Sequence, residues 1–225
     1  RRMSAIVAAD PAKKIRFALY NPRTRTVHNY PLLEELKMLD TSKRDPNKVC
    51  YVGAITRIRG IIPVLDSIQS LDVKLILAGA FDPPSLEDEC RRHPSWNKVE
   101  YLGFIDRVGV SEVLSRASVG MVIWLPNENY LDSLPIKMFE YMSASMPVVA
   151  SNFPNLKAIV EHYGCGLCVD PYKTEDITEA ILKLLSDKDL AATMGRRGHD
   201  AILSTLNWDS QAEILCELYE EVLAR

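Results

Sequence analysis

The sequence lacks any apolar run that approaches the ~18 consecutive residues a membrane-spanning helix needs. The N-terminal residues 1–10 also carry too short an apolar run for a signal peptide. The composition, 47% hydrophobic and 25% charged, is typical of a globular domain. We therefore expect a cytoplasmic location, and the sequence leaves peripheral association with the inner membrane face open.

Cysteines are few and odd in number, at positions 50, 90, 165, 168 and 216. In a chain of 225 residues they do not indicate a disulfide framework. Cys165 and Cys168 have C-x-x-C spacing, but no second pair or histidine cluster completes a zinc site. They lie in an apolar, strand-like run, so we interpret them as buried structural cysteines and expect no metal.

Signatures of nucleophilic catalysis are also missing, because the chain has no nucleophile elbow and no Ser-His-Asp signature.

The charge is distributed unevenly along the chain. The net charge is −3, yet residues 1–45 carry ten Lys/Arg against five Asp/Glu. Such an excess could contact an anionic membrane or a nucleic acid, but the charges are scattered and lack interleaved aromatics. We favour a solvated or partner-facing surface and expect no nucleic-acid binding.

From residue 46 onward the chain is regular, with strand and helix alternating six times. The expected strands are apolar nearly throughout and cover residues 48–53, 73–79, 98–103, 119–125, 147–151 and 166–170. This alternation predicts an α/β fold, a Rossmann-like parallel sheet with helices on both faces. In such sheets ligands bind at the carboxyl ends of the strands.

The first part of the chain does not fit that repeat. The first 30 or so residues predict one strand, one helix and one strand, which cannot bury their sheet edges alone, and a short helix and a polar linker follow them. We expect residues 1–45 to be the tail of an N-terminal domain plus a linker, followed by a Rossmann-like, ligand-binding domain at 46–205. Residues 206–225 predict a C-terminal helix that packs back toward the N-terminal domain.

Residues 129–142, after the fourth expected strand, concentrate the candidate chemistry. Pro135 suits the first turn of a helix, with Ser133 as a candidate cap. Lys137 in that first turn is unfavourable for the helix dipole, so the free N–H groups and the lysine together predict an anion site. Glu140 shares its face, and Asp132 precedes it in the loop. Each could instead be a solvated surface group, but their co-occurrence favours ligand binding.

A second candidate is the loop at residues 53–60, between the first expected domain strand and its helix. Gly53 and Gly60 permit close backbone approach, and Arg57 and Arg59 supply donors suited to phosphate. The loop is neither a P-loop nor a G-x-G-x-x-G fingerprint, so an exposed loop with solvated arginines remains the alternative.

The run from Asp132 to Glu140, followed by Tyr141-Met142 and by residues 147–151, resembles the E-x7-E region of retaining glycosyltransferases of family 4, also called group 1. The resemblance extends from about residue 29 to the helix at 208–219. It implies the donor-binding, C-terminal half of a GT-B glycosyltransferase, preceded by the last piece of its N-terminal domain.

That resemblance assigns roles to the candidate residues. Glu140 matches the second glutamate, which in the family binds the ribose hydroxyls of the donor, and Asp132 takes the place of the first, near the transferred sugar. Arg59-Gly60 matches a Lys-Gly pair whose cation binds the donor diphosphate. The backbone at Phe104 and Ile105 matches the loop that meets the base. Main-chain groups of Ser133 and Leu134 lie where the diphosphate or sugar approaches.

One position departs from the family pattern. Many members carry a basic residue directly after the glycine that corresponds to Gly53, where this chain has Ala54. Arg57 or Lys137 could supply the missing charge.

The resemblance implies transfer of a sugar from a UDP- or GDP-linked nucleotide sugar to a glycan or lipid-linked acceptor, with retention, in polysaccharide or glycoconjugate biosynthesis. Fixed cations and a helix N-terminus would stabilise the leaving diphosphate, so no metal is expected. The acceptor groups would lie mainly on a missing N-terminal domain, and we expect the isolated chain to bind donor but to transfer poorly. A non-catalytic nucleotide-binding or interaction module and a sugar-nucleotide epimerase remain alternatives.

Overall fold

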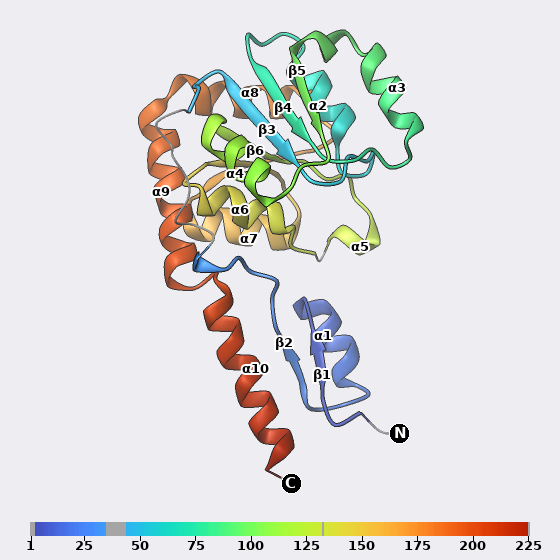
Figure 1. Ribbon diagram of the computed structural model, residues 1–225, viewed down its shortest axis with the longest axis vertical. Helices are drawn as coiled ribbons and strands as arrows, with labels where there is room; N and C mark the ends of the chain where they lie inside the picture. Colours follow the sequence, from blue (N-terminus) through green and yellow to red (C-terminus); the bar gives the residue numbers. More distant parts are fainter. Residues whose placement is uncertain (1–2, 35–43, 132, 225) are drawn as a thin grey trace.

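A computed structural model of the protein describes residues 3–34, 44–131 and 133–224. Its main body is a parallel sheet whose strands pair in the order β5-β4-β3-β6-β7-β8 (Figure 1). The strands are β3 (Lys48–Val52), β4 (Lys74–Ala78), β5 (Val99–Gly103), β6 (Val119–Val122), β7 (Val148–Ser151) and β8 (Gly166–Val169). All six predicted strands are present, which confirms the Rossmann-like α/β prediction.

Both faces of this sheet are covered, because successive side chains of a strand point to opposite faces. In β3, Val49 and Tyr51 join an apolar cluster with residues of α2 (Ile61–Ser67) and α8 (Thr174–Ser186). Cys50 and Val52 join the cluster on the other face, with residues of α4 (Arg107–Arg116), α6 (Ile136–Ser143) and α7 (Pro154–Tyr163). Two buried layers therefore sandwich the sheet, which explains why its strands are apolar at consecutive positions.

The remaining helices of the domain lie around this core. They are α3 (Ser85–Arg92), the 3-10 helix η3 (Pro94–Lys98), the short α5 (Glu128–Leu131) and α9 (Lys188–Ser204), which packs on α6 and α8. The chain reverses its direction of winding between β3 and β6, since β4 and β5 lie on one side of β3 and the later strands on the other. A ligand crevice is expected beyond the carboxyl ends of the strands at such a switch point.

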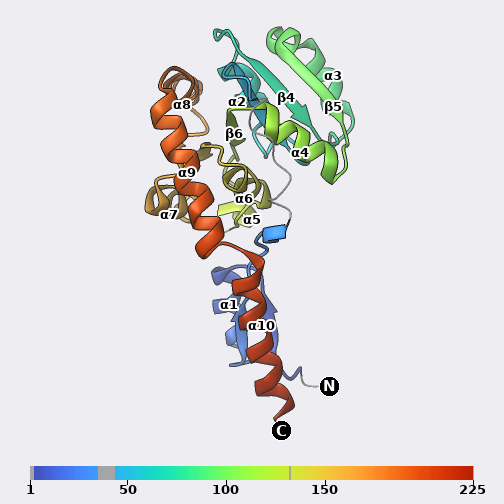
Figure 2. The ribbon, with the colours of Figure 1, turned by 60° about the vertical axis from the view of Figure 1, so that its left-hand side comes forward.

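A small unit lies away from the sheet. It contains β1 (Ile6–Ala8), α1 (Pro11–Ala18) and β2 (Thr24–Thr26), and the two strands pair in parallel. The last helix, α10 (Trp208–Leu223), leaves the domain and packs beside β2 (Figures 1 and 2). Arg25 pairs with Glu221 at 2.8 Å, and the backbone N–H of His28 donates to the side chain of Gln211. Of the helices in the described part of the chain, none has the length and apolarity needed to cross a membrane.

Candidate functional site

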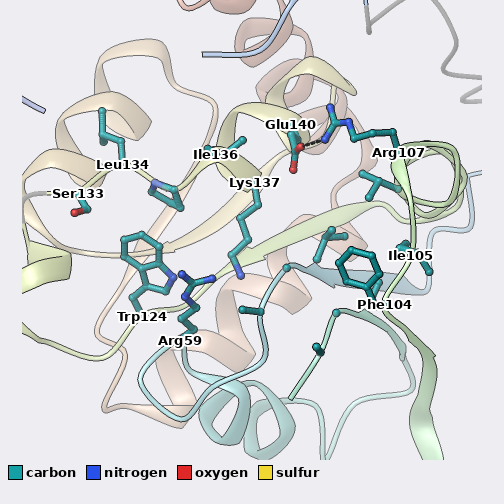
Figure 3. A pocket seen from close by; sticks show the side chains of 18 of the residues that line it. Arg59, Phe104, Ile105, Arg107, Trp124, Ser133, Leu134, Ile136, Lys137 and Glu140 are labelled. Atoms are coloured by element: carbon teal, nitrogen blue, oxygen red, sulfur yellow. Dashed lines mark hydrogen bonds and ion pairs between the residues drawn. The ribbon is translucent and has the colours of Figure 1, made fainter. Parts of the chain in front are cut away.

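A cavity of about 880 Å³ opens at the carboxyl edge of the sheet, at the switch point between β3 and β6. Its floor is formed by the ends of β3 and β4. One wall holds Arg59, Trp124 and the side chain of Lys137, and the opposite wall holds the loop after β5, the start of α4 and Glu140. Helix α6 contributes to both walls, because the side chains of Lys137 and Glu140 point to different sides of the cavity (Figure 3). Figure 3 shows side chains from these walls converging on the same space. The cavity therefore lies where the parallel topology predicts a ligand.

Two glycines form part of the floor of this cavity, where they place backbone without side chains. Gly53 and Gly79 follow β3 and β4 with φ of 111° and 144°, a backbone region that disfavours residues with a Cβ. A Cβ at Gly79 would meet the carbonyl oxygen of Gly53 at 1.9 Å. No atom of the described residues lies within 4 Å of the place where a Cβ of Gly53 would be. The backbone at Gly53 is therefore open to close approach by a ligand.

The loop between β3 and α2 presents Arg59 to the cavity. The Arg59 N–H donates to Thr56 Oγ1 at 3.0 Å, and its guanidinium lies 5.8 Å from the centroid of the Tyr130 ring. Gly60 begins α2 with φ of 73°, and a Cβ there would meet the carbonyl oxygen of Ile123 at 2.2 Å. Gly60 thus sets the path of the loop without lining the cavity.

Arg57, in the same loop, points elsewhere. Its guanidinium forms an ion pair with Glu89 on α3, and Arg57 does not line the cavity. The two arginines that the sequence treats alike are therefore placed differently. Only Arg59 faces the ligand space.

Lys137 is only 8% exposed, which argues against the alternative of a solvated surface lysine. Its side chain runs from α6 toward Arg59 (Figure 3), and Nζ lies 3.5 Å from the centroid of the Tyr51 ring. Among the described residues, Nζ has no hydrogen-bond partner. Burial, and then the nearby Arg59 guanidinium, lower the pKa of Lys137 to about 7. A buried ammonium without an acceptor is costly, and an anion placed beside it would offset that cost.

Trp124, just after β6, adds a second donor to the same wall. Its indole Nε1 is buried and finds no acceptor in the part of the chain that the structure describes. The ring packs against Tyr130, with 4.6 Å between ring centroids. An indole N–H can only donate, so this side of the cavity offers donors to an acceptor-rich ligand.

The opposite wall holds a carboxylate that already has a partner. Glu140 Oε1 accepts a hydrogen bond from Arg107 Nη1 at 2.5 Å, and both residues line the cavity (Figure 3). The Glu140 side chain is 12% exposed and the Arg107 side chain 60%. The pair therefore joins a mostly buried acceptor on α6 to a solvent-facing cation at the start of α4.

The loop after β5 forms the rim. Phe104 is 85% exposed and, with Ile105, lines the cavity. Asp106 caps α4 by accepting from the Gly109 N–H at 2.8 Å, which fixes the loop just before Arg107. A large apolar ring exposed at the mouth of a cavity can cover a flat ligand group.

The start of α6 differs from the expected one. The helix begins at Ile136 with Pro135 as its N-cap, and no side chain of the described residues caps it. Ser133 therefore does not cap α6, although Ser133 and Leu134 both line the cavity. Asp132 lies outside the described residues. The helix N-terminus opens into the cavity beside Lys137, as expected for an anion site.

Eight of the predicted site residues line this cavity: Gly53, Arg59, Phe104, Ile105, Ser133, Leu134, Lys137 and Glu140. Arg57 and Gly60 do not line it. Sequence reasoning missed Arg107, Trp124, Tyr130 and Gly79. The signal for Gly79 was available, since it ends a buried strand just as Gly53 does. Arg107 stood three residues after Phe104 but belonged to no motif.

In the described part of the chain, no group of three or more His, Cys, Asp or Glu side chains is arranged to hold a metal ion. The sequence contains one Asp-x-Asp, at Asp187-Lys188-Asp189. Asp187 caps α9 by accepting from the Leu190 N–H at 2.9 Å, and none of the three residues lines the cavity. This spacing is therefore explained by helix capping.

Comparison with known proteins identifies the family. Residues 35–201 match the family model described as glycosyl transferases group 1. The chain is 24% identical over 181 residues to an uncharacterized glycosyltransferase of Methanocaldococcus jannaschii. The matched region covers 78% of this chain and 45% of that protein. Relatives matched over more than three quarters of the chain are longer, and the chain spans 45% to 49% of their length.

Solved structures agree on the fold. The Anabaena protein HepE in complex with UDP-glucose is 16% identical with a TM-score of 0.81, covering 97% of this chain and 64% of that one. The C-terminal domain of a group 1 family glycosyl transferase from Francisella tularensis is 15% identical with a TM-score of 0.60, covering 79% of this chain and 95% of that one. The fold is that of the C-terminal domain of GT-B glycosyltransferases.

Proposed function

The chain belongs to the group 1 glycosyltransferases, and on that premise we propose that it is the donor-binding half of an enzyme that transfers a sugar from a nucleotide sugar. One observation carries the proposal. The wall of the cavity that holds Lys137, Trp124 and Arg59 offers buried or half-buried donors, and the first two have no acceptor among the described residues. A ligand rich in anionic oxygens, such as a diphosphate, would complete this wall.

In the proposed complex the donor diphosphate lies between Arg59 and Lys137, near the N-terminus of α6. Transfer breaks the bond between the anomeric carbon and a diphosphate oxygen, so negative charge grows on the leaving group. Two cations and a helix N-terminus fixed at that place would stabilise the charge without reorganisation. Lys137 would supply the cation that is absent at Ala54, a role that Arg57 cannot fill while it pairs with Glu89.

The nucleoside would occupy the other wall. Glu140 would accept hydrogen bonds from the ribose hydroxyls, and Phe104 and Ile105 would border the base. Ser133 and Leu134 would bring main-chain groups to the diphosphate or sugar, and Asp132 would lie near the transferred sugar. These placements follow the family resemblance, and the shared cavity supports those of Glu140, Phe104, Ile105, Ser133 and Leu134.

Several wider proposals rest on this one. The acceptor, a glycan or lipid-linked molecule, would be bound mainly by an N-terminal domain, of which residues 1–45 form the last part and onto which residues 206–225 pack. We propose a UDP- or GDP-linked donor, transfer with retention, a role in polysaccharide or glycoconjugate biosynthesis, and a cytoplasmic location with peripheral membrane contact. The complex of HepE with UDP-glucose supports a UDP-sugar as the first donor to test.

Titration calorimetry with UDP-glucose, GDP-mannose and ADP-glucose tests the proposal. We expect saturable binding of at least one of them, and binding about tenfold or more weaker in Arg59→Ala, since a charged hydrogen bond to phosphate contributes ~1.5–3 kcal/mol. Arg57→Ala is the matched control, because it removes an arginine of the same loop that does not line the cavity. Absence of binding to all three nucleotide sugars would contradict the proposal.

A further inference from the structure

Tyr51 lies beneath the cation wall and contacts both of its charged residues. It is the penultimate residue of β3, is fully buried, and packs on the face of the sheet that α2 and α8 cover. Its ring lies 3.5 Å from Lys137 Nζ, measured to the ring centroid. Its hydroxyl reaches the loop that carries Arg59. No other part of the proposed function uses this residue.

The contact with Lys137 crosses the edge of the sheet. α6 packs on one face of the sheet, and Tyr51 packs on the other. The Lys137 side chain therefore passes over the strand ends to rest its ammonium on the Tyr51 ring. The negative face of an aromatic ring attracts a cation, and most strongly where water is excluded. In the described residues this ring stands where a hydrogen-bond acceptor for Nζ would otherwise be required.

The hydroxyl group of Tyr51 holds the loop at both ends. It lies 3.0 Å from the carbonyl oxygen of Ala54 and 3.1 Å from that of Arg59, and its single proton is shared between them. Ala54 is the second residue of the loop and Arg59 the last before Gly60. One buried side chain thus sets the distance between the strand end and the residue that bears the guanidinium.

We propose that Tyr51 is a positioning residue for both phosphate-binding cations, its ring for the ammonium of Lys137 and its hydroxyl for the loop that carries Arg59. That the two cations bind phosphate rests on the proposed function. The contacts by which Tyr51 positions them are present in the ligand-free chain. The two parts of the side chain act separately. Tyr51→Phe keeps the ring and removes the hydroxyl, whereas Tyr51→Met and Tyr51→Leu remove both.

The surroundings of the ammonium make its titration easy to assign. Burial raises the pKa of Cys50 to about 12, and it raises those of Tyr51 and Tyr141 as well, so none of the three titrates near neutral pH. The charged and titratable groups around it are Cys50 and Tyr51 on β3, Arg59 on the loop, Tyr130 on α5, Glu140 and Tyr141 on α6, and Arg107 through its ion pair with Glu140.

The first test needs no ligand and uses the whole chain with ¹³C-labelled lysine. We expect the ε-methylene protons of Lys137 to be shifted upfield by the ring current in the wild type and in Tyr51→Phe. The titration of Lys137 near pH 7 should be kept in Tyr51→Phe and should move about one pH unit lower in Tyr51→Met or Tyr51→Leu, because the ring favours the charged form. An ε-methylene signal without a ring-current shift, or the same titration in all folded variants, would overturn the role of the ring.

The second test measures the hydroxyl by binding. The ligands are UDP-glucose, GDP-mannose and ADP-glucose. For each one that the wild type binds, we expect Tyr51→Phe to lower the affinity about fivefold, which is the effect of one hydrogen bond. Binding of the free nucleosides uridine, guanosine and adenosine should change less than twofold. A merely structural role would weaken both alike, and equal losses would overturn the positioning role of the hydroxyl.

Failure of the proposed function has a different signature. If no nucleotide sugar binds, the proposed function fails, yet the ring-current shift and the Lys137 titration still decide the role of the ring in the ligand-free chain. If nucleotide sugars bind and Tyr51→Met leaves the Lys137 titration unchanged, the function stands and this inference fails. The wild-type ring-current measurement remains decisive even if the Met and Leu variants do not fold.

Discussion

The two walls of the cavity differ in how completely the protein satisfies its own polar groups. On the carboxylate wall, Glu140 already accepts a hydrogen bond from Arg107 at 2.5 Å. On the cation wall, Lys137 Nζ and Trp124 Nε1 are buried and have no acceptor among the described residues. Unsatisfied buried donors are rare in folded proteins and call for an explanation such as a ligand. From this difference we infer that a bound ligand would complete the cation wall, whereas on the carboxylate wall it would replace Arg107 as the partner of Glu140.

The largest effect is expected at the cation wall. Lys137→Met should weaken binding of a nucleotide sugar at least about a hundredfold, because it removes a desolvated charge from the proposed diphosphate site. It should leave binding of the free nucleoside within about twofold. Calorimetry with both ligands checks this, and Arg57→Met, which removes a basic side chain that does not line the cavity, is the control. Equal weakening of both ligands would erase the distinction between the walls.

Loss of Glu140 should have the opposite ligand profile. Glu140→Gln keeps the shape of the side chain and removes its charge, so each ribose hydroxyl would lose a charged acceptor, with a loss of roughly tenfold to a hundredfold. The free nucleoside should lose as much affinity as the nucleotide sugar. Undiminished nucleoside binding would remove Glu140 from the ribose site.

The pH dependence of stability isolates the buried charge without any ligand. The pKa of Lys137 is lowered to about 7 in the folded chain from 10.5, so between these values the unfolded chain binds more protons, and stability rises with pH. The stability of the wild type relative to Lys137→Met should therefore increase by about 2 kcal/mol from pH 7 to pH 9. Urea unfolding of both proteins at the two pH values measures it. A constant difference would show that Lys137 is not a buried ammonium.

Much of the fold was predictable from the sequence. Buried parallel strands consist of short apolar runs, and each such run in this chain ends near a glycine or a polar loop. The site was predictable in part. Glu140 and Arg59 stand in a recognisable motif. The sequence does not distinguish Arg57 from Arg59, because the ion pair of Arg57 with Glu89 joins segments that are far apart in the chain. The sequence does not distinguish Tyr51 from the apolar residues of the same strand, so its contacts with Lys137 and with the loop could not be predicted.

The burial of Lys137 could not be predicted either. Its position early in a helix indicates a surface group, and only the approach of the strand ends to α6 encloses it. The cap of α6 was predicted wrongly for a related reason. Ser133 is a good capping residue by type, but the extended backbone of Pro135 starts the helix two residues later.

The smallest effect is expected from Arg107. Its side chain is 60% exposed, and exposed ion pairs contribute only ~0–1 kcal/mol, so Arg107→Ala should change nucleotide-sugar binding by less than about threefold. Calorimetry beside Arg59→Ala gives the comparison. A loss as large as that of Arg59→Ala would make Arg107 a third ligand-binding cation and would move the boundary between the two walls.

The account is tested most directly by a crystal structure of the chain with the nucleotide sugar that it binds. It predicts diphosphate oxygens within about 3.2 Å of both Lys137 Nζ and the Arg59 guanidinium, with the ribose hydroxyls on Glu140. A diphosphate that lies in solvent, or on the Arg107 side of the cavity with Lys137 still resting on the Tyr51 ring, would contradict it.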